Sequence, residues 1–163
     1  MNLLQASLGG SAAFREPEYI LENLTSEVAA KPVPGLPYTI ADVLYHLNAT
    51  MRASLDLASG RAADWPEGLE VWPDMPPSTE QHSAEQSSAE QLAQIRLDVA
   101  LALSEAVMLA EDPSERAREI LTDLAVNNAY HWGQVALIRR LHGDWSGEDP
   151  VTGGVVGGGV VGG

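Results

Sequence analysis

The chain has 163 residues and a mass of 17.4 kDa, the size of one compact domain that can close a hydrophobic core. Nine lysines and arginines stand against 23 aspartates and glutamates, and the net charge of -14 argues against nucleic-acid backbones and anionic membranes as partners. The sequence contains no cysteine, which excludes disulfides, thiolate metal sites and cysteine nucleophiles. Any metal chemistry must therefore use His, Asp, Glu or Asn.

The first 14 residues carry no basic region, and their apolar run is too short and too broken for a signal sequence or a membrane span. We therefore expect a cytoplasmic protein without membrane association. Ala and Leu dominate the apolar residues, and β-branched residues are sparse outside the C-terminal tail. This composition favours helices over strands.

The first helix is expected to begin between residues 11 and 16. Gly9 and Gly10 interrupt any helix that begins at Leu3, and Pro17 is tolerated because it falls in the first turn of the new helix. Apolar residues then recur at helical spacing: Ile20, Leu21, Leu24 and Val28. The segment 31–37 contains three prolines and is predicted to be a linker.

The second helix is expected to begin after Thr39 and to end near residues 59–60. Asp42 follows Thr39 by three residues, which is the spacing of a capping box with Asp in place of the usual Glu. The apolar residues that follow form one stripe: Ile40, Val43, Leu44, Leu47, Met51, Leu55 and Ala58. Residues 61–83 are rich in helix breakers and form a long connection, which Trp65 and Trp72 are expected to pack down.

Two long helices are expected in the second half of the chain. The third runs from about Ala84 to Ala110, and its inward positions include Leu92, Ile95, Val99, Leu103 and Val107. The fourth begins at Asp112-Pro113-Ser114-Glu115, interpreted as an N-cap, a proline at the first helical position and a glutamate at the third. It is expected to end near 141–142, before Gly143.

Four amphipathic helices in this order predict an all-α fold, a four-helix bundle with a long loop between helices two and three. Residues 1–150 form this domain, and no strand is expected within it. Residues 151–163 form a tail of glycine and valine. Its paired valines, at 155–156 and 160–161, are predicted to dock into an apolar groove of this chain or of a neighbour.

Asn127 and His131 interrupt the inward apolar stripe of the fourth helix. They are four residues apart, so they lie on one face, one turn apart, and both can reach one small ion or molecule. A buried hydrogen-bonded pair is the alternative interpretation. His46 lies off the centre of the second helix's stripe, which by itself indicates an exposed or groove-lining histidine. His142 lies about 16 Å beyond His131 along the helix and cannot share an ion with it.

Together these residues carry a family resemblance. The sequence TIADVLYHL at 39–47 and the sequence NNAYHWGQVALIRR at 127–140 resemble the DinB/YfiT-like superfamily of four-helix-bundle proteins. In that superfamily a histidine on helix two and an H-x-x-x-H pair on the last long helix, followed by Gly-Gln, form a three-histidine metal site. The resemblance covers residues 11–143 and implies that His46 and His131 are metal ligands, with Gln134 orienting one of the ligands.

Asn127 stands where the family has the first histidine of that pair. Imidazole binds zinc and nickel well, whereas an amide oxygen is a weak ligand that suits harder cations. Three interpretations remain open: a weakened site of His46, Asn127 and His131, a site completed by another carboxylate or water, and a metal-free descendant. Asp123 and Asn128 are nearby, but neither can replace the missing histidine ligand without local rearrangement.

The resemblance implies a metal-dependent hydrolase or a transferase of low-molecular-weight thiols, with a small-molecule substrate and a divalent zinc or nickel ion. Such an ion, with open positions, lowers the pKa of water or of a thiol and polarises a carbonyl. No serine triad and no paired carboxylates occur at motif spacing, so no catalytic residue is assigned. The alternative is a metal-free, non-catalytic bundle that binds a small molecule or acts through dimerisation.

Three further expectations concern packing. A homodimer is expected through the alanine-rich faces of helices two and three, because bundles of the superfamily often pair and alanine suits close approach. Gly133 predicts close backbone approach by a neighbour, since glycine destabilises a helix by about 1 kcal/mol relative to alanine. Arg139 and Arg140 are expected to complement the dipole at the end of the fourth helix.

Overall fold

The computed structural model describes residues 1–11, 15–74 and 84–145, and these residues form six α-helices and no strand. The helices are α1 (Leu3–Gly9), α2 (Pro17–Ile20), α3 (Ser26–Ala30), α4 (Ile40–Ala58), α5 (Ala84–Leu109) and α6 (Glu115–Leu141). The all-α prediction is confirmed for this part of the chain. None of its helices is long and apolar enough to cross a membrane. The valine-containing tail, 151–163, lies outside the described residues.

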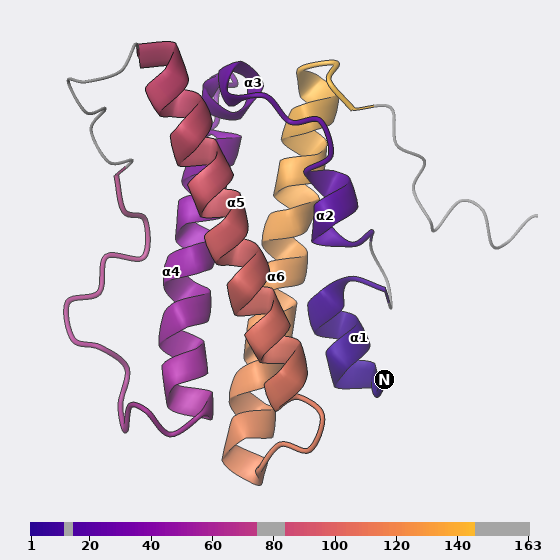
Figure 1. The fold of residues 1–163 in the computed structure, drawn as a ribbon, viewed down its shortest axis with the longest axis vertical. Helices are drawn as coiled ribbons and strands as arrows, with labels where there is room; N and C mark the ends of the chain where they lie inside the picture. Colours follow the sequence, from indigo (N-terminus) through magenta and orange to yellow (C-terminus); the bar gives the residue numbers. More distant parts are fainter. Residues whose placement is uncertain (12–14, 75–83, 146–163) are drawn as a thin grey trace, which may run out of the picture.

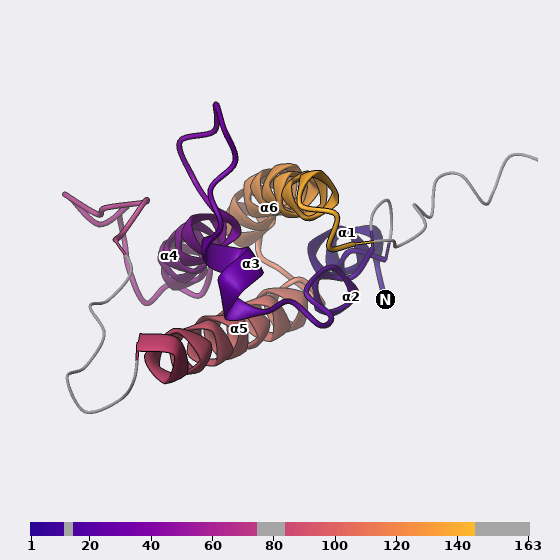
Figure 2. The same ribbon diagram turned by 90° about the horizontal axis from the view of Figure 1, so that it is seen from above.

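The three long helices share one core, α1 and α2 lie along one side of it, and α3 lies at one end, near α4 and α5 (Figure 1). Helix α4 packs against both α5 and α6, and α1 packs against α5 and α6. Helix α2 lies on α6, and α3 lies on α4 and α5. Figures 1 and 2 show that α4 and α5 run in the same direction while α6 runs in the opposite one. The connection from α4 to α5 therefore has to return along the length of the molecule.

The prediction of one continuous first helix is wrong. Helix α2 ends at Ile20 and α3 begins after Thr25, although Pro17 does occupy the first turn of α2 as predicted. Between them, Asn23 adopts a left-handed backbone with φ of 56°, which an α-helix does not accept. The Thr25 hydroxyl then accepts a hydrogen bond from the Val28 N–H at 3.3 Å and caps a new helix.

Helix α4 begins and ends as predicted. The Thr39 hydroxyl accepts a hydrogen bond from the Asp42 N–H at 3.3 Å, and the Asp42 carboxylate accepts one from the Thr39 N–H at 2.7 Å. This is the reciprocal pair of a capping box. The predicted apolar stripe is buried from Ile40 to Leu55, and Ala58 is half-buried.

Helices α5 and α6 also lie where they were expected, with one correction. The N-cap of α6 is Ser114, whose hydroxyl accepts a hydrogen bond from the Ala117 N–H at 3.2 Å, so Asp112 and Pro113 precede the helix. The hydroxyl rather than the Asp112 carboxylate satisfies the free N–H group of the first turn. At the other end, Gly143 follows the last turn with φ of 69°, a left-handed backbone that favours glycine.

Two packing expectations change in the structure. Ala102, Ala106 and Ala110 of α5 are fully buried and belong to the chain's own core, whereas Ala100 of the same helix is exposed. The close approach expected at Gly133 is not found among the described residues, because a Cβ placed there meets no atom within 4 Å.

Arg139 is buried and does more than complement the helix dipole. Its guanidinium donates to the backbone carbonyl oxygens of Ile20 at 2.6 Å and Glu22 at 2.8 Å, and it pairs with the Asp144 carboxylate at 2.6 Å. These contacts join the end of α6 to the chain around α2. Arg140, in contrast, is exposed and lies over the ring of Trp145.

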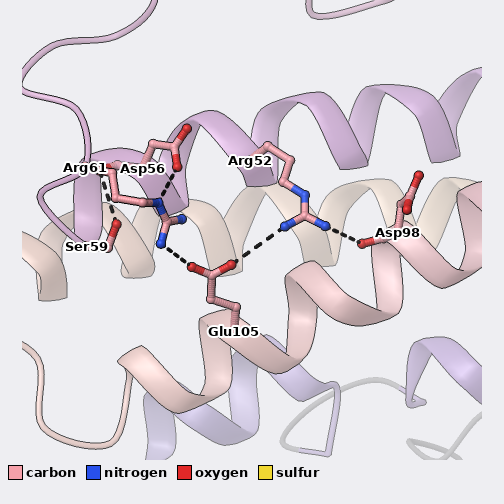
Figure 3. A network of polar contacts seen from close by, with 6 residues as sticks. All are labelled: Arg52, Asp56, Ser59, Arg61, Asp98 and Glu105. Atoms are coloured by element: carbon pink, nitrogen blue, oxygen red, sulfur yellow. Dashed lines mark hydrogen bonds and ion pairs between the residues drawn. The ribbon is translucent and has the colours of Figure 1, made fainter.

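A surface network of ion pairs joins α4 to α5 (Figure 3). Glu105 of α5 pairs with Arg61 at 2.7 Å and with Arg52 of α4 at 3.7 Å, and Arg61 also pairs with Asp56 at 2.7 Å. These side chains are all partly exposed, so water and salt screen each pair and its contribution to stability is small. The network supports the parallel arrangement of the two helices without being its main cause, which is the shared apolar core.

A candidate two-histidine site

The structure brings His46 of α4 and His131 of α6 into direct contact. The centroids of the two imidazole rings are 4.4 Å apart, and the ring planes meet at 63°. Both side chains are buried. His46 is therefore neither exposed nor isolated, and its partner is the histidine that the family resemblance implied.

A backbone carbonyl fixes the tautomer of His46. Its Nδ1 lies 2.6 Å from the carbonyl oxygen of Val71, in the connection that follows α4. A carbonyl oxygen only accepts hydrogen bonds, so Nδ1 carries the proton. In the neutral ring, Nε2 then keeps its lone pair and can act as a metal ligand or as a proton acceptor.

A glutamine orients His131 in the same way. The His131 Nδ1 lies 2.7 Å from Gln134 Oε1, and Gln134 Nε2 donates to the phenolic oxygen of Tyr38 at 2.8 Å. Since the amide nitrogen is used toward Tyr38, the amide oxygen faces the histidine and accepts its Nδ1 proton. His131 therefore also keeps the lone pair on Nε2. Both histidines show the outer hydrogen bond that commonly orients metal-binding imidazoles.

Trp72 covers one side of the histidine pair. Its ring stacks on His46 at a centroid distance of 4.0 Å and 16° between planes, and Tyr38 stacks on Trp72 at 5.5 Å. Stacking covers the face of an imidazole, whereas the Nε2 lone pair lies in the ring plane, so this contact leaves the lone pair of His46 accessible. The prediction that both tryptophans pack down holds only in part: Trp72 stacks on His46 but is 39% exposed, and Trp65 is 46% exposed.

Burial lowers the pKa of both histidines. For His46, the hydrogen bond to Val71 opposes this effect in part. For His131, the hydrogen bond to Gln134 opposes it, and the positive charge of a protonated His46 would lower the pKa further. Both rings are consequently neutral at pH 7, which is the state in which imidazole binds a metal ion.

Asn127 is half-buried, one turn before His131 on α6, and its side-chain Nδ2 is buried without a hydrogen-bond partner. Asn128 is fully buried, and neither polar atom of its side chain has a partner. Asp123 is exposed, and His142 lies at the far end of α6, with Nε2 3.1 Å from the Lys31 carbonyl oxygen.

Across residues 1–11, 15–74 and 88–145, no three His, Cys, Asp or Glu side chains are grouped so that they could hold a metal. Besides the histidine pair, any further ligand from this part of the chain would thus be of another type, such as the amide of Asn127. Two neutral imidazoles with free Nε2 atoms fit zinc or nickel, and an amide oxygen adds a weak third ligand.

An open cleft of about 460 Å³ lies next to Tyr38 and Trp72, and neither histidine lines it. It is lined by Pro37, Tyr38, Asp42, Trp72, Pro73 and Asp74. Tyr38 and Trp72 belong both to this cleft and to the shell around the histidines. The cleft is large enough for a small organic molecule, and its charged groups are carboxylates.

Sequence reasoning missed two parts of this arrangement. Val71 accepts the hydrogen bond from His46 through its backbone carbonyl, so its side-chain type does not indicate this role. Tyr38, which holds Gln134, lies next to the proline-rich linker, far from His131 in the sequence. The only related signal was Gln134 itself, one turn after His131, which indicated a polar partner for the histidine.

Comparison of the chain with protein-family models, with curated proteins and with solved structures finds no match. What links the chain to a family is therefore the resemblance of residues 39–47 and 127–140. The geometry of the two histidines is independent of that resemblance.

Proposed function

We propose that the chain is a DinB/YfiT-like four-helix-bundle protein in which His46 and His131 bind a divalent zinc or nickel ion, with Asn127 as a weak third ligand. The observation that supports this most is the shared tautomer of the two histidines. Each donates its Nδ1 proton to a fixed acceptor, Val71 or Gln134, and each keeps the Nε2 lone pair. Two neutral imidazoles that contact each other can supply two of the ligands of a metal site.

We further propose that the activity is that of a metal-dependent hydrolase or of a transferase of low-molecular-weight thiols. A bound divalent ion supplies an acidified water or thiol and polarises a carbonyl. The protein's own part is positional: Val71 and Gln134 hold the rings, Trp72 shields one face of His46, and Tyr38 holds Gln134. The adjacent cleft receives a small substrate.

Metal binding is tested on protein purified without an affinity tag, by elemental analysis and by calorimetric titration with zinc and nickel. We expect one ion per chain, and we expect His46→Ala and His131→Ala each to lose most of the binding. His142→Ala is the matched control, because His142 contacts the Lys31 carbonyl and not the pair. No binding by the unmodified chain would contradict the proposal and favour a metal-free bundle that binds a small molecule.

Asn127→His supplies a further test of the same site. An imidazole four residues before His131 recreates the spacing of a two-histidine helical ligand pair. We expect zinc or nickel to bind more tightly than in the parent, with weaker binding as the pH falls, because only neutral imidazole binds the ion. Adding His46→Ala should cancel most of the gain. Equal affinity of parent and Asn127→His would show that position 127 does not face the site.

A further inference from the structure

The cleft of about 460 Å³ lies where two separate parts of the chain meet. One part is the end of the proline-rich linker with the first turn of α4, and the other is the connection that follows α4. Figure 1 shows this connection running back beside α4 toward the start of the helix. The lining residues are of two kinds, with rings (Pro37, Tyr38, Trp72 and Pro73) or with carboxylates (Asp42 and Asp74).

The aromatic rings of the cleft are held by the residues around the histidine pair. Tyr38 stacks on Trp72 at a centroid distance of 5.5 Å with 20° between the ring planes, and its hydroxyl accepts a hydrogen bond from Gln134 at 2.8 Å. Trp72 also stacks on His46, yet it remains 39% exposed. Rings that are fixed in this way give a preformed surface to a flat apolar group, and an aromatic face attracts a cation.

The charged groups that line the cleft are both acidic. Asp74 is exposed, and no described residue pairs with its carboxylate. Asp42 uses Oδ2 to accept hydrogen bonds from the N–H and the hydroxyl of Thr39, at 2.7 and 2.8 Å, whereas its Oδ1 has no hydrogen-bond donor among the described residues. Exposed Glu70 adds a carboxylate to the same connection. A cation entering the cleft is attracted, and an anion is repelled.

Two nearby sources of positive charge do not reverse this preference. The first turn of α4 carries the partial positive charge of a helix N-terminus, and the Asp42 carboxylate in that turn offsets it. Lys31 is the basic residue closest along the chain to the lining residues, but it is exposed and does not line the cleft. The net charge of -14 attracts cations over longer distances.

We infer that this cleft binds a small organic cation, a protonated amine or a quaternary ammonium group attached to a flat apolar body. The apolar body packs against Tyr38 and Trp72, and the cationic group lies near the carboxylates of Asp42 and Asp74. Because both aromatic rings also contact the residues of the histidine pair and its shell, the bound molecule lies next to the candidate metal site. That this cation is the substrate rests on the proposed function, whereas its binding does not.

Probes that share one phenyl ring separate the effect of charge from that of shape. They are 2-phenylethylamine, which is protonated at pH 7, the neutral 2-phenylethanol and the anion 3-phenylpropionate. Each is titrated into the unmodified chain in the presence of a chelator, so that no metal contributes. Binding is followed through the indole N–H signals of the tryptophans in proton–nitrogen NMR spectra, which Trp65→Phe and Trp72→Phe assign.

We expect the amine to shift the Trp72 signal saturably and to bind about tenfold more tightly than the alcohol, with the anion weakest. The signals of exposed Trp65 and of buried Trp132 should not move. Added salt should weaken the binding of the amine and not that of the alcohol. Equal affinities for the amine and the anion would overturn the inference, and so would a shift confined to Trp65.

Asp74→Asn tests the carboxylate that is free to meet a ligand. The side chain is exposed and makes no pair within the described chain, so the fold should be retained. We expect the amine to bind about threefold more weakly than to the parent, and the alcohol to bind equally. Asp64→Asn is the matched control, because Asp64 is an exposed carboxylate of the same connection that does not line the cleft. Equal losses in the two variants would show that only the overall charge attracts the amine, and an unchanged affinity in Asp74→Asn would also refute the inference.

The result can be separated from that of the metal titrations. A chain that binds the amine in the cleft but takes up neither zinc nor nickel retains the cation site and contradicts the proposed function. A chain that binds metal but does not distinguish the amine from the anion retains the proposed function and overturns this inference.

Discussion

His46 and His131 hold their ring orientations through groups from other parts of the chain. Val71 belongs to the connection after α4, and Gln134 is itself held by Tyr38, which lies just before α4. An imidazole whose Nδ1 proton is already engaged needs little reorganisation to present Nε2 to an ion. The arrangement therefore explains why both histidines are oriented before anything binds, whereas their burial lowers the pKa of both and keeps the rings neutral.

Removing the glutamine should weaken the site without removing a ligand. We expect Gln134→Ala to lower zinc or nickel affinity by about 10–100-fold, because His131 loses the acceptor that fixes its tautomer. Calorimetric titration measures the change. Gln94→Ala is the control, since Gln94 is exposed and bonds only to Asp98 on α5. Equal affinities in the two variants would show that the hydrogen bond to His131 does not affect metal affinity.

The lowered pKa values of the two histidines predict a pH effect on stability. Between the folded-state pKa and the unfolded value of about 6.5, the unfolded chain binds more protons than the folded one. Their contribution to the free energy of unfolding is therefore complete above pH 6.5 and is lost as the pH falls through the folded-state pKa. Urea unfolding in the presence of a chelator should show this loss.

The comparison for this pH effect is the double variant His46→Gln, His131→Gln. Acidic groups elsewhere also contribute to the pH dependence, and the variant retains all of them. We expect its free energy of unfolding to fall less than that of the parent between about pH 7.5 and pH 5.5. Parallel curves for the two proteins would mean that burial does not shift these histidines.

The contact of the two histidines was predictable only through family resemblance. Helical spacing put Asn127 and His131 on one face, but nothing in that spacing related them to His46 on another helix. The distance between α4 and α6 follows from the packing of the whole core. Backbone acceptors such as Val71 are invisible in the sequence, because every residue carries the same carbonyl.

Among the helices, α4 has the clearest start signal, and its cap is a measurable part of stability. Thr39→Ala should lower the free energy of unfolding by about 1 kcal/mol, because the Asp42 N–H loses its acceptor at the end of the helix. Chemical denaturation measures the loss. Thr122→Ala is the control, since the Thr122 hydroxyl is exposed and bonds only to the Arg118 carbonyl inside α6. Similar losses in the two variants would contradict a capping role for Thr39.

Long helices with caps were predicted well, and short segments were not. The apolar stripe and capping box of α4, and the apolar spacing of α5, predicted the limits of these helices to within two residues. The break between α2 and α3 escaped prediction because the apolar spacing of Ile20, Leu24 and Val28 continues across it. The left-handed conformation of Asn23 depends on local packing, and asparagine is also common in ordinary helices and loops.

For the molecule as a whole, Arg139 is the side chain that ties the end of α6 to the chain around α2. Arg139→Met should lower the free energy of unfolding by about 3–5 kcal/mol, because it leaves the Ile20 carbonyl and the Asp144 carboxylate without their partner. Chemical denaturation again provides the measurement. Arg118→Met, at an exposed position of the same helix, should change stability by less than about 0.5 kcal/mol. A loss of unfolding free energy in Arg139→Met as small as that in Arg118→Met would show that the Arg139 contacts are dispensable.

The order of α4, α5 and α6 along the chain also determines when the molecule can be completed during synthesis. His46 and His131 are 85 positions apart (131 − 46), and at about 5–20 residues per second the second follows the first by about 4–17 seconds. During that interval α4 can pack against α5, but the face that α6 covers remains open to water. A chain released before α6 therefore exposes an apolar surface and lacks one imidazole of the pair. The candidate site exists only in chains that have been made almost to the end of α6.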